Sequence, residues 1–322
     1  MSKPSVVLVS ASYDHTIRVW DPATANPLKT IRVNESQVNA LAVSPDKRYV
    51  AAACNPVIKI FDLTKPADAP PVAIMEGHTG NVTAVGFDQT GRWLYSGGAD
   101  GTVRAWDPRT GQCPRTFLAD VAKTDDWNDN RKSAINCVTL HPNQGELLVG
   151  DQGGRVRVCD LTSATSVVIA TPEPDVAMRS LAIAFDGSRI FMATDSGKVH
   201  QWAPPSCESM LNVAEVVLKS FDAHDTYCLK CAVSPDLKYL ATASADHTCK
   251  IWKISDLRAP IRVLSKHQLW VWDVAFSADS SYLVTAGSDH SVLLFDVASG
   301  ELLRVFTGHA KAVVALALND QG

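Results

Sequence analysis

Short runs of alternating hydrophobic and polar residues recur along the whole chain, and most are separated by turns rich in Asp, Gly, Asn or Ser. Alternation of this kind places the hydrophobic side chains on one face of a β-strand, and such turns join two strands into a hairpin. Ser10–Asp21 is typical, with one run on each side of Asp14. Strong helical periodicity is absent from the sequence. The pattern therefore predicts an all-β fold.

The hairpin is an internal repeat that occurs seven times. The clearest copies are Ser10–Asp21, Ser96–Asp107, Thr242–Lys253 and Thr285–Asp296. The weaker copies are Ala51–Asp62, Val149–Asp160 and Met192–Ala203. Successive copies are separated by 41 to 53 residues, and a four-stranded propeller blade usually takes about 40–45 residues. The repeat therefore predicts a propeller of seven blades.

Strands outside the hairpins complete each predicted blade. One β-prone run precedes each hairpin and another follows it, which predicts four strands per copy. The pattern begins with a second strand at Val6–Ser10 and ends with a lone first strand at Val313–Leu318. We expect segment 312–318 to complete the N-terminal blade and close the ring, because closure removes an open sheet edge. Residues 1–322 are then expected to form a single seven-bladed β-propeller domain.

Composition and charge narrow the classes of function. The chain has 46% hydrophobic residues and a net charge of −4, so it can form a core but lacks the basic stripe of a nucleic-acid-binding protein. Uninterrupted apolar runs reach only about seven residues, too few for a transmembrane segment. The eight cysteines are expected to be reduced, and the Cys228/Cys231 pair lacks a second ligand pair for zinc. We therefore expect no metal and no cofactor.

The repeats resemble those of the WD-repeat family over the whole chain. In that family a His before the first strand, a Ser or Thr on the second, an Asp in the hairpin turn and a Trp on the third form a hydrogen-bonded tetrad. The matching sets are His78/Ser96/Asp100/Trp106, His224/Thr242/Asp246/Trp252 and, across the ring closure, His309/Ser10/Asp14/Trp20. In the seventh blade, the set His267/Thr285/Asp289 ends in Phe295 instead of Trp. The second, fourth and fifth blades depart from the pattern, and we expect packing to hold them together.

Serine, histidine and aspartate in one set also invite comparison with a catalytic triad. The His-to-Asp spacing is 22 residues in three separate copies, whereas a hydrolase needs only one activated nucleophile. Repetition therefore favours a structural role. The sequence contains no phosphate-binding glycine loop, nucleophile elbow or zinc-protease motif. We expect that the protein is not an enzyme.

Function is then expected where loops and strands meet on the histidine side of the ring. The residues that enter the first strands there are, in ring order, Ala312/Val314, Gln37/Asn39, Asn81/Thr83, Ala134/Asn136, Ala177/Ser180, Tyr227/Leu229 and Trp270/Trp272. The large side chains gather on consecutive blades and form the set Tyr227, Trp270, Trp272, Tyr13, Gln37 and Asn39. Aromatic residues dominate interface hot spots, so we expect this set to bind a protein partner. The alternative is that the aromatic rings pack between blades.

Several segments resemble the small WD-repeat subunits of the target of rapamycin (TOR) kinase complexes, the Lst-eight family. The segments include Ser12–Asp21, Glu35–Asp46, Gly91–Gly98, Ile135–Gly154 and the W-x-W at Trp270/Trp272. The resemblance implies a non-catalytic subunit that does not self-associate and binds the TOR kinase catalytic domain beside Raptor-like or Rictor-like scaffolds. The aromatic set would face the kinase. The location would be cytoplasmic, or peripheral on endomembranes through the complex.

Two insertions and one short motif leave other possibilities open. The loop Asp120–Ser133 and the insertion before the sixth blade lengthen two connections, and Leu211–Leu218 is expected to be the last strand of the fifth blade. Cys159 stands where the family has Trp. Trp106–Arg109 matches the W-D-x-R signature of substrate receptors of cullin-type ubiquitin ligases. That signature is short, and Arg109 is a typical turn residue. Another kind of WD-repeat assembly scaffold is the remaining alternative.

Overall fold

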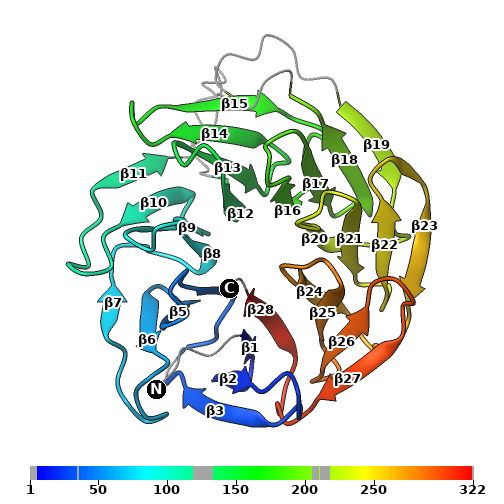
Figure 1. Cartoon of the computed structure of the whole chain (residues 1–322). Coiled ribbons are helices and arrows are strands. Elements are labelled where there is room, and N and C mark those ends of the chain that lie inside the picture. The colour runs from blue at the N-terminus through cyan, green and yellow to red at the C-terminus, as the bar shows by residue number, and fades with distance from the viewer. Residues whose placement is uncertain (1–5, 35, 119–132, 205–209, 211–217, 321–322) are drawn as a thin grey trace.

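Seven antiparallel four-stranded sheets surround a central axis in the computed structural model (Figure 1). The structure describes residues 6–34, 36–118, 133–204, 210 and 218–320. Every regular element in these ranges is a β-strand, as the short β-prone runs between turns predict. The prediction of an all-β propeller of seven blades is confirmed.

The strands occupy four positions in each blade, from the channel outward. The innermost strands are β28 (Val313–Asn319), β4 (Ala40–Val43), β8 (Val82–Phe87), β12 (Ile135–Leu140), β16 (Met178–Ile183), β20 (Cys228–Val233) and β24 (Val271–Phe276). The second strands are β1 (Val7–Ser12), β5 (Tyr49–Ala53), β9 (Leu94–Gly98), β13 (Glu146–Asp151), β17 (Ile190–Thr194), β21 (Tyr239–Ser244) and β25 (Tyr282–Gly287). The third strands are β2 (Thr16–Trp20), β6 (Ile58–Asp62), β10 (Thr102–Trp106), β14 (Val156–Asp160), β18 (Lys198–Trp202), β22 (Cys249–Lys253) and β26 (Val292–Asp296). The outer strands are β3 (Pro27–Arg32), β7 (Ala73–Met75), β11 (Arg115–Leu118), β15 (Ser166–Ala170), β19 (Leu218–Asp222), β23 (Asp256–Leu264) and β27 (Leu302–Phe306).

Residues from the two ends of the chain close the ring. The C-terminal strand β28 pairs antiparallel with β1, from Val7 opposite Asn319 to Ser12 opposite Val313. The same sheet continues outward through β2 and β3. The ring closure expected at segment 312–318 is therefore present, and it gives the N-terminal blade its innermost strand.

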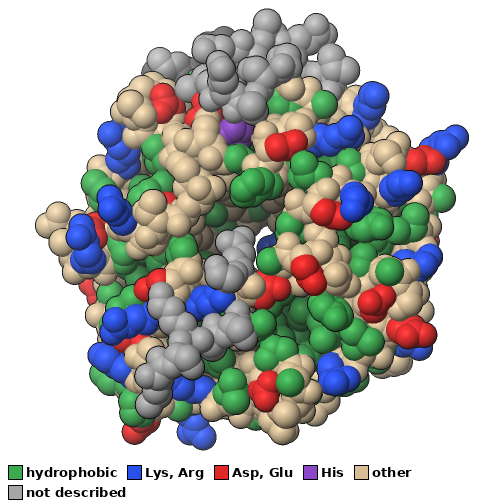
Figure 2. All heavy atoms as spheres, viewed as in Figure 1, with side chains coloured by type: hydrophobic (Ala, Val, Ile, Leu, Met, Phe, Trp, Pro, Cys, Tyr) green, Lys and Arg blue, Asp and Glu red, His purple; other side chains and the backbone are tan. Residues whose placement is uncertain are grey.

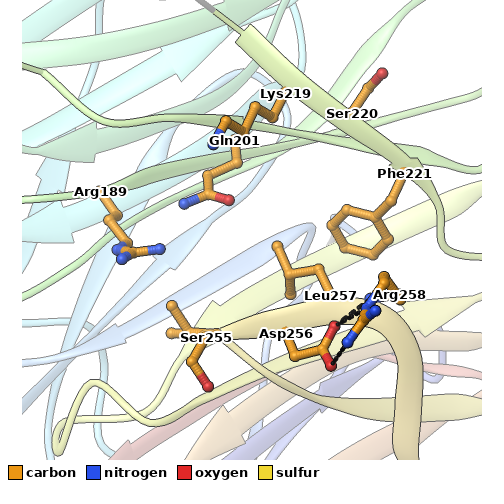
Figure 3. Close-up of a pocket in the computed structure, with 10 residues that line it drawn as sticks. Arg189, Gln201, Lys219, Ser220, Phe221, Ser255, Asp256, Leu257 and Arg258 are labelled. Atoms are coloured by element: carbon orange, nitrogen blue, oxygen red, sulfur yellow. Dashed lines mark hydrogen bonds and ion pairs between the residues drawn. The ribbon is translucent and has the colours of Figure 1, made fainter.

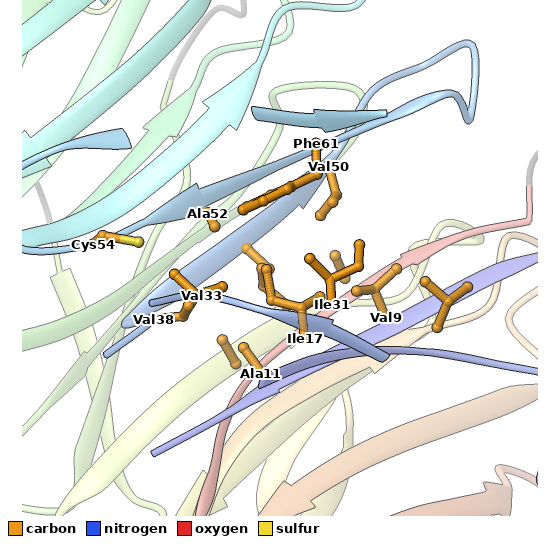
Figure 4. Close-up of a cluster of buried hydrophobic side chains, with 14 of the residues drawn as sticks. Val9, Ala11, Ile17, Ile31, Val33, Val38, Val50, Ala52, Cys54 and Phe61 are labelled. Atoms are coloured by element: carbon orange, nitrogen blue, oxygen red, sulfur yellow. The ribbon is translucent and has the colours of Figure 1, made fainter. Parts of the chain in front are cut away.

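Hydrophobic clusters lie at the contacts between neighbouring blades. Between the first two blades, Val9 and Ile17 pack with Val38 and Phe61 (Figure 4). A further cluster joins the seventh blade to the first and buries Trp20. Comparable clusters occupy the other blade contacts. Burying apolar surface is worth roughly 25 cal/mol per Å², so each blade is stabilised mainly by its neighbours.

The two ends of the blades carry different turns. One end holds the tetrad histidines and the hairpin turns with Asp14, Asp100 and Asp246, and we call it the histidine face. The opposite end holds the turns between the first and second strands and the C-terminal end of β28, and we call it the terminal face. In the view of Figure 2, Lys and Arg side chains are interspersed with Asp and Glu around the rim.

The residue after the turn aspartate adopts the left-handed conformation. The φ angle is 63° at His15, 70° at His247 and 68° at His290, and glycine takes the same place at Gly101. A residue with positive φ lets a short turn join two twisted strands. The alternation of Asp-His and Asp-Gly among the repeats therefore reflects backbone geometry.

Two sequence expectations need comment. The last strand of the fifth blade is β19 (Leu218–Asp222), which pairs with β18, and the predicted Leu211–Leu218 falls outside the described residues except for Leu218. The predicted loop Asp120–Ser133 falls outside the described residues except for Ser133.

Among the residues that the structure describes, no helix is long and apolar enough to cross a membrane.

Candidate functional site

A directional chain of hydrogen bonds links the tetrad of the third blade. The Trp106 indole N–H donates to Ser96 Oγ at 2.8 Å, and Ser96 Oγ lies 2.8 Å from His78 Nε2. His78 Nδ1 lies 3.0 Å from Asp100 Oδ2. Because the serine oxygen already accepts the indole proton, its own proton points to His78 Nε2, and Nδ1–H donates to the carboxylate. Every polar group of the set has a partner.

The other two complete tetrads have the same geometry. In the sixth blade, Trp252 donates to Thr242 at 3.0 Å, and His224 lies 2.8 Å from Thr242 and 2.7 Å from Asp246. Across the closure, the tetrad side chains of the first blade are joined at 2.7 to 3.0 Å by the contacts Trp20–Ser10, Ser10–His309 and His309–Asp14. In the seventh blade, His267 lies 2.8 Å from Thr285 and 2.9 Å from Asp289. Phe295 has no side-chain hydrogen-bond donor, so the bond that Trp makes to the Ser or Thr in the other blades is missing there.

Burial keeps two of the tetrad histidines neutral. It lowers the pKa of His78 and of His309, and it outweighs the attraction of Asp100 and Asp14, which would raise them. Burial alone would raise the pKa of Asp14, but hydrogen bonds from Thr16, Ala310 and His309 lower it to about 2. The set therefore combines a neutral imidazole with an ionised carboxylate, as the hydrogen-bond directions demand.

The fifth blade contains a polar network that its sequence pattern did not predict. Glu173 Oε2 accepts hydrogen bonds from Thr194 at 2.8 Å and Ser196 at 2.6 Å, and Glu173 Oε1 lies 3.1 Å from Lys198 Nζ. Burial opposes ionisation of Glu173, but these donors lower its pKa to about 2. The expectation that packing alone holds this blade is wrong. The available signal was spacing, because Glu173 lies 23 residues before Ser196, close to the His-to-Asp interval of 22.

Most of the innermost strands contain a β-bulge, which takes one residue out of regular pairing with the second strand. Register shifts follow Val82, Ile135, Met178, Cys228 and Val271, and the extra residues are Thr83, Asn136, Arg179, Leu229 and Trp272. Bulges re-aim side chains, and all five of these residues line the central cavity.

The fifth blade therefore presents Arg179, and the predicted Ala177/Ser180 pair is wrong by one residue. Ser180 is buried and bonds to Cys231 of the sixth blade. Arg179 makes two hydrogen bonds to Asp195, at 2.6 and 2.8 Å. Aligning the buried Met178 with Cys228 and Val271 would have found Arg179 from the sequence.

Three of the predicted partner-binding side chains form one cluster on the histidine face. The Tyr227 and Trp270 rings meet edge to face with centroids 6.2 Å apart, and Trp270 and Trp272 lie 5.4 Å apart. Tyr227 is 44% exposed and Trp270 is 38% exposed, while Trp272 is half-buried. The Trp272 indole N–H donates to Ser288 Oγ at 2.7 Å, which fixes its ring. We call these three residues the aromatic cluster.

The other predicted residues lie on the neighbouring blades. Tyr13 is half-buried, and its backbone N–H donates to the Ala312 carbonyl at 3.0 Å. Gln37 is exposed, whereas the Asn39 side chain donates to the Val82 carbonyl at 3.0 Å. Among the described residues, the aromatic ring contacts of the cluster do not extend to Tyr13. The structure thus joins three of the six residues directly and places the other three nearby in ring order.

In the described part of the chain, no three His, Cys, Asp or Glu side chains lie close enough together to bind a metal ion. Cys228 and Cys231 are free and buried, and burial raises the pKa of both thiols. Lys230 beside the channel pairs with Asp273 at 3.2 Å. These groups are therefore satisfied within the fold.

Arg109 of the W-D-x-R segment is a turn residue. Its backbone N–H donates to Asp107 Oδ1 at 2.9 Å, and its guanidinium contacts the same carboxylate at 3.3 Å. The side chain is 82% exposed. The motif thus has a structural explanation in the capping of its own turn.

Comparison with known proteins agrees with this geometry. The family described as "WD domain, G-beta repeat" matches residues 2–21, 25–62, 69–107, 215–253 and 258–296. The Target of rapamycin complex subunit wat1 of Schizosaccharomyces pombe is 43% identical over 98% of this chain and 96% of its own length. The Target of rapamycin complex subunit LST8 of Bos taurus is 41% identical over 98% of this chain and 95% of its own length. A protein of Arabidopsis thaliana named "Non-functional target of rapamycin complex subunit LST8-2" is 40% identical over 83% of this chain and 82% of its own length. The chain belongs to the LST8 family of WD-repeat proteins.

Proposed function

We propose that this protein is a non-catalytic subunit of TOR kinase complexes and that its aromatic cluster binds the TOR kinase domain. The complexes would also contain Raptor-like or Rictor-like scaffolds and act in the control of cell growth. The observation that carries the proposal is the contiguous, partly exposed set Tyr227, Trp270 and Trp272 on the histidine face of an LST8-family propeller. One relative at 40% identity is named non-functional, so overall identity cannot carry the proposal alone.

The aromatic cluster suits a binding role for physical reasons. Trp270 and Trp272 flank the first residue of β24, and Tyr227 directly precedes β20, so rigid strands hold all three. Edge-to-face contacts and the bond to Ser288 limit their motion before binding. Little side-chain entropy is then lost when a partner covers the rings. Truncating one such anchor typically costs about 2 kcal/mol or more of binding energy.

The repeated His–Ser–Asp sets support a non-catalytic role. The Ser96 side chain is buried and its oxygen already bonds both Trp106 and His78, so a substrate has no path to it. The same arrangement recurs in the first and sixth blades, and its serine or threonine is buried each time. A buried, saturated hydroxyl stabilises the fold and is a poor nucleophile.

Binding would act on the kinase through mass action. A rigid surface that binds only the ordered form of a kinase element stabilises that form by RT ln(1 + [L]/Kd). The kinase then spends more time in its competent conformation. We place the assembly in the cytoplasm, with attachment to endomembranes through the other subunits.

Affinity purification tests the proposal. Trp272→Ala should leave the circular-dichroism melt near that of the wild type and reduce co-purification of TOR, and Trp270→Ala should act in the same direction. Tyr282→Ala is the matched control, because Tyr282 is 41% exposed and begins β25 at the terminal face. Full retention of TOR by both folded tryptophan variants would exclude the aromatic cluster as the binding surface.

A further inference from the structure

A groove opens between the fifth and sixth blades at the rim, near the terminal face. It has a volume of about 710 Å³ and is lined by residues of β18, β19 and β23 and of the turns before β17 and β23. Figure 3 shows Arg189, Gln201 and Lys219 on one side and Phe221, Leu257 and the Asp256–Arg258 pair on the other. The aromatic cluster lies at the opposite ends of the strands, so both surfaces can be occupied at once.

The floor of the groove is apolar and rigid. The Phe221 ring packs on Trp252 with centroids 4.8 Å apart, and its other side faces the groove. Leu257 is partly buried against the cluster that joins the fifth and sixth blades. Ile254 lies beneath, with its backbone N–H bonded to the Lys238 carbonyl at 2.9 Å. The floor is therefore a preformed binding site for one apolar side chain.

Positive charge surrounds this floor. Arg258 is neutralised by Asp256, with contacts of 2.7 and 2.8 Å. Arg189 and Lys219 also line the groove, and within the described ranges neither side chain makes an ion pair or hydrogen bond. The hydrogen bond from Ser188 and, to a smaller extent, the charge of Arg189 lower the pKa of Asp186. Arg189 and Lys219 thus flank the apolar floor without a hydrogen-bonded or ion-paired partner among the described residues.

The backbone of β19 adds a third feature. This strand is the outermost of its sheet, and Lys219, Ser220 and Phe221 are consecutive lining residues. An edge strand presents free N–H and C=O groups that can bind an extended peptide. The described part of the chain supplies no further strand to this edge.

We infer that this groove binds an extended acidic peptide segment of a partner protein, with an apolar side chain on Phe221 and Leu257 and carboxylates toward Arg189 and Lys219. Charge complementarity selects this occupant, because a basic segment would place like charges beside the two cations. The inference is independent of the proposed kinase-binding surface.

Methyl NMR of the full chain tests the inference. The probe is the peptide Gly-Asp-Glu-Asp-Phe-Asp-Glu-Asp-Gly, and the readout is the shift of the Leu257 and Ile254 methyl signals. We expect saturable shifts at low salt that weaken as salt rises. The same peptide with Lys and Arg in place of its acids, and the peptide with Gly in place of Phe, should bind much more weakly.

Two kinds of variant locate the binding. Arg189→Glu combined with Lys219→Glu should weaken the acidic peptide roughly tenfold or more, because two favourable charge contacts become repulsive. Ser255→Trp should block the groove sterically without changing its charge. Lys266→Glu is the matched control for charge reversal, because Lys266 is exposed and precedes His267 at the histidine face, and it should leave the affinity within about twofold. Equal binding by all variants, or equal binding of the acidic and basic peptides, would overturn the inference.

Discussion

The Trp106 indole and the His78 imidazole are joined through a single buried hydroxyl, since Ser96 Oγ lies 2.8 Å from each nitrogen. Trp106 lies on the third strand of the blade, Ser96 lies on the second strand, and His78 lies in the connection before the first strand. A local hydrogen-bond chain therefore ties together parts of the blade that packing alone would leave free to shift.

Replacing the tetrad histidine should destabilise the fold. His78→Ala leaves Ser96 and Asp100 with unmatched buried groups, so we expect the free energy of unfolding to fall by about 1–3 kcal/mol. Chemical denaturation and the melting temperature measure this change. His290→Asn is the control, because His290 is exposed and Asn tolerates its positive φ. Equal loss of stability in the two variants would contradict the structural role of the tetrad.

Acidification should destabilise the protein in two steps. Burial lowers the folded-state pKa of His78 and His309, so their neutral forms stabilise the fold fully above the unfolded pKa of about 6.5, and this contribution falls as pH drops below it. The pKa of Asp14 is lowered to about 2 in the fold, so its contribution is present above about pH 4 and is lost below it. Melting temperatures across a pH series should fall first below about pH 6.5 and again below about pH 4. A constant melting temperature from pH 8 down to about pH 5 would show that the histidines do not contribute.

The turn glycine of the fifth blade should not tolerate a side chain. Gly197 has a φ of +83°, and a Cβ there would overlap the backbone carbonyl oxygen of His224. Gly197→Ala should therefore lower stability by more than about 1 kcal/mol. Gly145→Ala is the control, since its Cβ would meet only Asn143 Oδ1 at 3.8 Å. Thermal melts of the two variants should differ clearly, and similar melts would contradict the turn geometry.

Ring closure should be essential for cooperative folding. Truncation after Ala312 removes β28, which leaves β1 with an open edge and exposes Leu8 and Val9 of the neighbouring clusters. We expect loss of a cooperative melt and aggregation through the free edge. Truncation after Asp320 removes only two residues and should melt like the full chain. A soluble, cooperatively folded protein ending at Ala312 would contradict the closure.

Much of this fold could be predicted because repetition makes each weak signal visible seven times. The strand alternation, the turn aspartates and the 22-residue His-to-Asp spacing identified the blades, and the orphan run Val313–Leu318 identified the closure. The register of the fifth blade was missed because its consensus residues are absent. A bulge after Met178 gives Arg179 the place that Leu229 and Trp272 take on the next two blades, and aligning Met178 with Cys228 and Val271 would have predicted it.

The candidate site was predicted only in part for a similar reason. Alternation placed Trp270 and Trp272 on one side of their strand, and ring order placed Tyr227 on the neighbouring blade. The structure shows that the Tyr227 and Trp270 rings are in contact. Glu173 stayed hidden because a carboxylate replaces a histidine at nearly the same spacing. The groove beside β19 is formed by residues from two blades, so no local sequence pattern could predict it.

Site-specific photo-crosslinking shows directly whether the aromatic cluster contacts the kinase. A benzoylphenylalanine at position 227 replaces an exposed tyrosine of the cluster, and the same group at position 282 replaces an equally exposed tyrosine at the terminal face. After irradiation of the assembled complex and mass spectrometry, we expect a crosslink from position 227 to the TOR kinase domain and none from position 282. A kinase crosslink from position 282 alone would contradict it.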